Sequence, residues 1–198
     1  MADQKMSEHI LSITAAHDDI DYALVRAIAQ GDAQALDKLY ARHGPGLLAY
    51  LTGRLGERQL AEEVLQDVML AVWKGAGRFR GESKVRTWLL SIARYRAINA
   101  QRRRRLPQVT LDETIPVQGE NEPQQVLEQS TKQEYLNRAM AHLPAEQRET
   151  LELIFYHGLS GPEAASIQGI SVGTVKSRLH RAKKALRKWL HMEESTHA

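Results

Sequence analysis

The chain has 198 residues, a formal net charge of +3 and no cysteine, and 42% of its residues are hydrophobic. This composition is ordinary for a protein with a buried core, and it excludes disulfides, thiol nucleophiles and cysteine-ligated zinc. Aromatic residues make up only 6%, which together with plentiful leucine, alanine and glutamate favours helix over sheet. No apolar run suits a signal peptide or a membrane span, so we expect a cytoplasmic protein with no membrane insertion.

Basic residues gather in two blocks that contain no acid. Eight lie between Lys84 and Arg105, and seven lie between Lys176 and Lys188. A single block of this kind is often only a solvated helix face. Two such blocks, separated by acidic stretches, indicate two places where a polyanion such as nucleic acid can dock.

The first predicted elements are a pair of helices joined by a tight turn. Between Tyr22 and Arg42, apolar residues at helical spacing are interrupted by Gly31 and Asp32. This predicts two helices, with Asp32 as the N-cap of the second. The sequence HGPG at 43–46 then predicts a break, after which a third helix begins.

Residues 57–74 form the next periodic segment, an amphipathic helix. Its apolar stripe predicts a core position for Trp73. The polar residues that fall largely off the stripe are Glu62, Glu63, Gln66 and Asp67. A glycine-rich loop at 75–83 ends this helix and precedes a long basic one, from Lys84 to about Arg103. The arginines at the end of the long helix suit its dipole without any ligand.

Residues 106–131 contain three prolines and lack a sustained period, which predicts a flexible acidic linker. The expected fold class is therefore all-α, with two small helical domains joined by this linker. The first domain covers 21–105, after an N-terminal extension at 1–20. The second covers 132–192.

The second domain has the helix caps and the turn glycine of a helix-turn-helix. Gly158 is placed as a C-terminal cap, and Ser160 with Glu163 forms a capping box for the next helix. Gly169 provides the turn, and Ser171 is positioned to cap the final helix.

The final helix has a polar outward face that suits the major groove of DNA. Arginine can bind guanine in bidentate fashion, and serine or threonine hydroxyls can reach phosphate or base. A packed helix with a solvated basic face would show a similar pattern. The tight turn and the two caps favour DNA contact.

The long helix of the first domain combines an aromatic residue with cations. Trp88 precedes Arg94, Arg96, Asn99 and Arg102 along the helix. Rings that stack and charges that neutralise phosphate are what single-stranded nucleic acid requires. A core position for Trp88 is the alternative interpretation.

Four stretches, in matching order between about Tyr22 and Trp189, resemble the bacterial RNA polymerase sigma factors of the extracytoplasmic-function (ECF) group. They read LAEEVLQDVMLAVWK, GRFRGESKVRTWLLSIARYRAIN, LPAEQRETLELIFYHGLSGPEAA and GISVGTVKSRLHRAKKAL. The resemblance implies an all-helical, two-domain subunit that directs RNA polymerase to promoters. It also implies three partners: core RNA polymerase, promoter DNA and, as in many such proteins, an anti-sigma factor.

The resemblance also implies three sets of contacts. The residues implied to contact the clamp helices of the largest polymerase subunit are Glu62, Glu63, Gln66 and Asp67. Those implied to contact the melted −10 element are Arg80, Lys84, Arg86, Trp88, Arg94 and Asn99. Those implied to contact the −35 element are Ser171, Thr174, Lys176, Ser177, Arg178 and Arg181.

Two other classes of function remain to be weighed. A stand-alone helix-turn-helix regulator would use residues 22–105 for sensing or dimerisation, and it would bind a two-fold symmetric operator without polymerase. An enzyme would need a phosphate loop, a metal site or an activated nucleophile, and the sequence shows none of these patterns. We therefore expect no cofactor, no metal and no catalytic residue.

Overall fold

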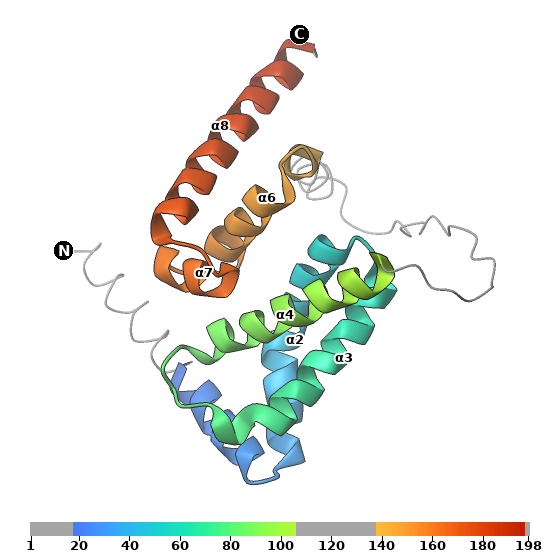
Figure 1. Cartoon of the computed structure of the whole chain (residues 1–198), viewed down its shortest axis with the longest axis vertical. Helices are drawn as coiled ribbons and strands as arrows, with labels where there is room; N and C mark the ends of the chain where they lie inside the picture. Colours follow the sequence, from blue (N-terminus) through green and yellow to red (C-terminus); the bar gives the residue numbers. More distant parts are fainter. Residues whose placement is uncertain (1–17, 106–137, 197–198) are drawn as a thin grey trace, which may run out of the picture. The chain divides into compact units, whose positions relative to one another are not determined.

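The structure is a computed structural model, and it describes residues 18–105 and 138–196 (Figure 1). All regular elements in these two ranges are helices, which confirms the predicted all-α class. The chain divides near Arg103 into two compact units, each described below by itself. The predicted linker and most of the predicted N-terminal extension lie outside the described residues.

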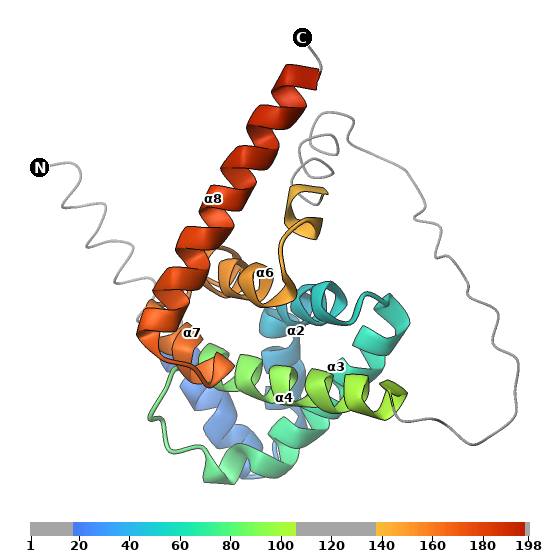
Figure 2. The same ribbon diagram turned by 45° about the horizontal axis from the view of Figure 1, so that its top comes forward.

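The first unit begins with a helix at residues 18–29, followed by helix α2, Ala33–Leu55. Gly31 has a φ of 88°, and the Asp32 side chain accepts a hydrogen bond of 3.2 Å from the Ala35 N–H. The predicted Gly-Asp turn and N-cap are therefore confirmed. The two helices lie side by side in both views (Figures 1 and 2).

The predicted break at HGPG is wrong, because α2 continues without interruption through Pro45. Proline in a helix interior ordinarily costs about 3 kcal/mol, since a hydrogen bond is lost and its ring crowds the preceding turn. Burial on both sides of Pro45 offsets this cost. Leu39 and Leu51 are fully buried and Leu47 is nearly so, which keeps one face of the helix in the core.

Two further helices complete the first unit. Helix α3 spans Arg58–Gly75 and continues into a short 3₁₀ turn, η1, at Ala76–Arg78. A loop at residues 79–84 leads to helix α4, Val85–Arg105. The buried face of α3 contains Ala61, Val64, Leu65, Val68, Met69 and Val72, and α4 contributes buried leucines and alanines. The amphipathic helix, the glycine-rich loop and the long basic helix are thus confirmed.

The second unit starts with helical residues 138–141 and continues into α6, Ala145–Leu151. A π-helical turn, η2, follows at Glu152–Tyr156. Helices α7, Gly161–Gln168, and α8, Val172–Thr196, complete the unit. The core of this unit joins the segment before α6, α6 itself and α8. It contains Leu143, Leu151 and Ala182, with Met140, Leu179 and Leu186 packed against them.

Candidate nucleic-acid and protein interfaces

Helices α7 and α8 form a helix-turn-helix whose caps are in place. The Ser160 N–H donates to the Glu163 carboxylate over 2.8 Å, and the Glu163 N–H donates to Ser160 Oγ over 3.4 Å. Gly169 supplies the turn with a φ of 67°, and Ser171 Oγ accepts a 3.1 Å bond from the Thr174 N–H. The capping box and the Ser171 cap are confirmed.

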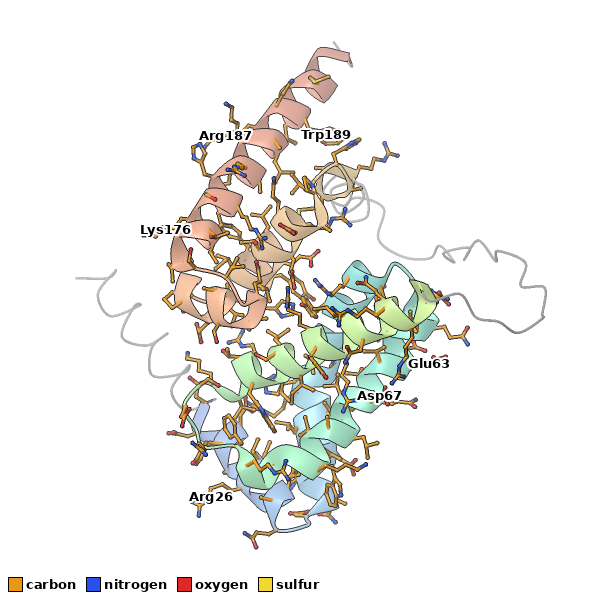
Figure 3. All side chains as sticks on the ribbon, in the orientation of Figure 1. Arg26, Glu63, Asp67, Lys176, Arg187 and Trp189 are labelled. Carbon is orange, nitrogen blue, oxygen red and sulfur yellow. The ribbon has the colours of Figure 1, made fainter. Side chains whose placement is uncertain are left out.

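The start of α8 presents cations to solvent. Lys176 and Arg181 are exposed, while Val175 and Ala182 are fully buried and fix the rotation of the helix. Within residues 18–105 and 138–196, neither Lys176 nor Arg181 lies within ion-pair distance of an acid. Lys176 projects away from the ribbon at the first turns of α8 (Figure 3). These two charges are therefore available to an anion.

The hydroxyl groups of this face are engaged in the first turns of α8. Ser171 Oγ and Thr174 Oγ1 lie 2.9 Å apart, and Ser177 Oγ donates to the Thr174 carbonyl over 3.2 Å. Ser171 and Ser177 are exposed, whereas Thr174 is half-buried. All three hydroxyls still have lone pairs or protons to share, but their positions are set by the helix.

Arg178 differs from the other cations of α8. Its guanidinium forms a salt bridge with Glu146, in the first turn of α6. The Arg178 side chain is only 17% exposed, and the Glu146 side chain is 71% exposed. Sequence reasoning did not find this pair, because the two residues are 32 positions apart and belong to different helices.

Polar side chains cover the outer face of α3. All four residues proposed to contact polymerase, Glu62, Glu63, Gln66 and Asp67, are exposed. Glu63 and Asp67 point outward from this helix (Figure 3). The next turn adds Leu70 and Trp73, which are 49% and 37% exposed. The core position predicted for Trp73 is thus wrong, because the tryptophan lies at the edge of the buried stripe.

The loop at 79–84 and the start of α4 hold the residues assigned to the −10 element. Arg80 is exposed and lies 3.7 Å from Glu82, while Lys84 Nζ lies 3.1 Å from Asp18 Oδ2. Trp88 is half-buried and stacks on Phe79, with ring centroids 4.7 Å apart and an interplanar angle of 29°. Trp88 therefore has a packed side and an accessible one.

The other residues of α4 assigned to the −10 element are half-buried. They are Arg86, Arg94 and Asn99. Tyr95 is 64% exposed, the most exposed aromatic residue described in the first unit. Its exposure is a feature that the sequence pattern did not reveal.

A buried ionic cluster fixes the first helix to α2. Asp21 is 4% exposed, and its two carboxylate oxygens contact Arg42 Nε at 2.6 Å and His43 Nε2 at 2.7 Å. Burial raises the pKa of Asp21, but the hydrogen bonds and charges of His43 and Arg42 outweigh it, so the pKa lies below its ordinary value. Asp21 therefore stays ionised near neutral pH.

The described residues offer little for other classes of site. Among the side chains that the structure describes, histidine and acidic residues form no group of three that would hold a metal ion. In the same ranges we find no helix with both the length and the apolar character of a membrane span.

Comparison with known proteins identifies the chain's family. Residues 39–106 match the description Sigma-70 region 2, and residues 133–186 match Sigma-70, region 4. The chain is 34% identical over 177 residues to the ECF RNA polymerase sigma factor SigM of Mycobacterium tuberculosis, covering 88% of this chain and 86% of that protein.

Two solved structures share the fold. The structure of CnrH in complex with the cytosolic domain of CnrY is similar with a TM-score of 0.65 and 25% identity, covering 88% of this chain and 99% of that one. The sigma factor RpoE of Bartonella quintana, in complex with the anti-sigma factor NepR, is similar with a TM-score of 0.59 and 26% identity. That likeness covers 78% of this chain and 96% of RpoE. The chain therefore belongs to the ECF sigma factors of RNA polymerase.

Proposed function

We propose that this sigma factor directs polymerase to promoters through three surfaces: α3, the loop at 79–84 with α4, and the start of α8. The observation that carries the proposal is the capped, solvent-exposed cationic start of α8, on a helix-turn-helix of the sigma family. A stand-alone regulator is not favoured, because region 2 and region 4 of a sigma factor occur together in one chain.

The α3 surface is proposed to bind core RNA polymerase, on the clamp helices of its largest subunit. The groups of this surface that are complementary to a basic partner are Glu62, Glu63, Gln66 and Asp67. Glu62 also lies 2.9 Å from Arg58 Nε, one turn earlier in α3. Leu70 and Trp73 add exposed apolar area at one end of this surface, of the kind that supports a stable protein interface.

The loop at 79–84 and α4 are proposed to bind the −10 element as a single strand. Arg80 and Lys84 supply positive charge, and Trp88 offers a partly accessible ring. Unstacking a base costs a few kcal/mol, so captured bases and polymerase contacts must together offset that cost. Arg86, Arg94 and Asn99 extend the polar surface along α4.

The start of α8 is proposed to bind the −35 element in the major groove. Arg181 and Arg178 are candidates for reading bases, whereas Lys176 suits phosphate. Arg178 must first exchange its partner Glu146 for DNA. Ser171, Thr174 and Ser177 add hydroxyls whose positions are fixed by the helix start.

A protein inhibitor is the third proposed partner. RpoE of Bartonella quintana was solved in complex with the anti-sigma factor NepR. We extend to this chain the proposal that an anti-sigma factor binds it. Catalysis is assigned to the polymerase and none to this chain.

A run-off transcription assay with purified core RNA polymerase tests the proposed function. Promoter DNA is first selected from a random library by the reconstituted holoenzyme, which gives both elements and their spacing. We expect transcripts from linear templates only when both proteins are present. Occupancy of the selected DNA by the chain alone, with no initiation on adding core enzyme, would overturn the sigma reading in favour of a regulator.

A further inference from the structure

Helix 18–29 is held firmly against α2. Val25 and Ile28 are almost fully buried, and Asp21 accepts hydrogen bonds from Arg42 and His43. Buried apolar area and a charge-assisted pair together make this helix a fixed support. The adjacent face of this helix, which carries Asp18 and Tyr22, is therefore also fixed in direction.

That neighbouring face meets the loop at 79–84 at two points. Asp18 and Tyr22 are four residues apart, so they lie on the same side of the helix. Asp18 Oδ2 lies 3.1 Å from Lys84 Nζ, at the end of the loop. The Tyr22 ring centroid lies 6.0 Å from that of Phe79, at the beginning of the loop. In Figures 1 and 2 the first turn of this helix lies beside the loop that enters α4.

Tyr22 also covers the middle of the loop. Gly81 has a φ of 74°, and a Cβ atom there would lie 2.8 Å from Tyr22 Cε2. The phenol ring therefore packs directly on the loop backbone, and only glycine combines this backbone conformation with this close approach. The loop holds no turn of helix or strand that would fix it from within.

The ring contacts continue from the loop into α4. Phe79, whose ring centroid lies 6.0 Å from that of Tyr22, also stacks on Trp88, with centroids 4.7 Å apart. Tyr22, Phe79 and Trp88 thus form a row that links helix 18–29 to α4 through the loop. The pieces of the row come from three separate segments of the sequence.

We propose that Tyr22 is a positioning residue for the −10 contact, holding the loop at 79–84 so that Arg80, Lys84 and Trp88 keep one arrangement. The inference rests on the proposed function for its DNA-binding consequence, but the restraint of the loop is a property of the chain alone. Tyr22 itself is 39% exposed and is assigned no contact with DNA.

Hydrogen–deuterium exchange on the full-length chain tests the restraint of the loop. Loss of the ring contacts in Tyr22→Ala is expected to raise amide exchange in residues 79–84 by about fivefold, with core amides of α2 unchanged. Tyr22→Phe keeps the ring and should exchange like the wild type. Tyr40→Ala removes another exposed tyrosine, from α2, and is the matched control.

The same variants are then assembled with core RNA polymerase on promoter DNA selected by the wild-type holoenzyme. Permanganate reactivity of thymines near −10 reports melting, and native gels report holoenzyme formation. We expect Tyr22→Ala to form holoenzyme normally but to melt the promoter at least about fivefold less well. Tyr22→Phe and Tyr40→Ala should both melt it normally.

Distinct outcomes separate this inference from the proposed function. Unchanged loop exchange in Tyr22→Ala would overturn the restraint, and raised exchange with normal melting would overturn the positioning role. Failure of the wild-type holoenzyme to melt any promoter would instead overturn the proposed function, and the positioning role with it. If Tyr22→Ala does not fold, Tyr22→Leu removes the ring while keeping an apolar side chain, and it is judged by the same two measurements.

Discussion

The two units differ in whether their basic side chains are paired with acidic ones. At the start of α8, Lys176 and Arg181 are exposed with no acidic partner in ion-pair distance among the described residues. In the first unit, Lys84 lies against Asp18 and Arg80 lies near Glu82. The first set can meet phosphate at once, whereas the second must exchange a carboxylate for a phosphate.

This difference suggests an order of events for promoter binding. If α8 binds the −35 duplex as proposed, contact through Lys176 and Arg181 requires little rearrangement and is the easier first step. If the loop at 79–84 binds the −10 strand as proposed, it gains only the difference in free energy between two similar ionic contacts. A high effective concentration of the −10 strand, produced once polymerase and the −35 element are bound, would compensate for that small gain.

Arg181→Ala gives the largest expected effect and tests the exposed set. If the guanidinium makes a bidentate contact with guanine, its loss should cost about 1–3 kcal/mol of discrimination at one −35 position. Competition binding of the holoenzyme to promoters with single −35 substitutions measures this effect. An equal loss of affinity on every −35 sequence would contradict base reading by Arg181.

Asp21→Asn tests the ionic cluster that holds helix 18–29 against α2, and with it the partner of Lys84. Asn keeps one acceptor oxygen but replaces the other with an NH₂ donor and removes the charge, so one of Arg42 and His43 loses its acceptor. We expect a loss of about 2 kcal/mol in the unfolding free energy of the first unit. Denaturant titration followed by tryptophan fluorescence measures it. Asp37→Asn, at an exposed aspartate on α2, is the control and should have little effect.

The difference in stability between wild type and Asp21→Asn should depend on pH. Because the pKa of Asp21 is lowered in the folded state, the unfolded state takes up a proton first as the pH falls. The stability advantage of wild type over Asp21→Asn should therefore shrink as the pH falls below about 4, where the carboxyl group of the unfolded state becomes protonated. An advantage that grows below that pH would contradict this assignment.

Glu146→Gln tests whether Arg178 is available to DNA, as proposed for Lys176 and Arg181, or instead joins α8 to α6. Since Glu146 is mostly exposed, the loss of its charge should lower the stability of the second unit by no more than about 1 kcal/mol. If Arg178 serves DNA, releasing it should raise holoenzyme affinity for −35 duplex. A fall in affinity that parallels the loss of stability would show Arg178 to be a brace between α6 and α8.

Lys176→Ala gives the smallest expected effect. A lysine that contacts phosphate releases about one counterion, so its removal should reduce the slope of log K against log salt by about 0.9 on every sequence. Holoenzyme binding measured between low and moderate salt gives the slope. A change confined to one −35 sequence would point to base contact by Lys176 instead.

Local signals in the sequence predicted much of the fold. Asp32, Ser160 and Ser171 each cap a helix through a neighbour three positions away, so the sequence contains the whole interaction. Pro45 misled the prediction because its cost is offset by Leu39, Leu47 and Leu51, whose burial depends on other helices. Caps and turns formed by residues close in sequence can be predicted from the sequence. Burial against other helices, which can outweigh such local signals, cannot.

The candidate surfaces were less fully predictable for the same reason. Exposure of Glu62, Glu63, Gln66 and Asp67 followed from helical periodicity alone. Partners such as Asp18 for Lys84 and Glu146 for Arg178 join residues from separate helices or loops, and no spacing rule links them. The apolar stripe did not reveal that Trp73 lies at its edge.

The π-helical turn η2 determines how the helix formed by α6 and η2 would respond to the loss of one residue. Its closing hydrogen bond runs from the His157 N–H to the Glu152 carbonyl, over 3.0 Å, and so encloses one residue more than an α-helical bond would. Beyond it, the Leu159 N–H reaches the Leu153 carbonyl around Gly158 over 3.0 Å, a closure that also encloses one residue more than the ordinary six-to-one bond of a helix end. The turn thus stores a single surplus residue between two well-anchored ends. A chain lacking one residue here would close as ordinary α-helix and would turn Phe155 and Tyr156, now both exposed, toward new directions.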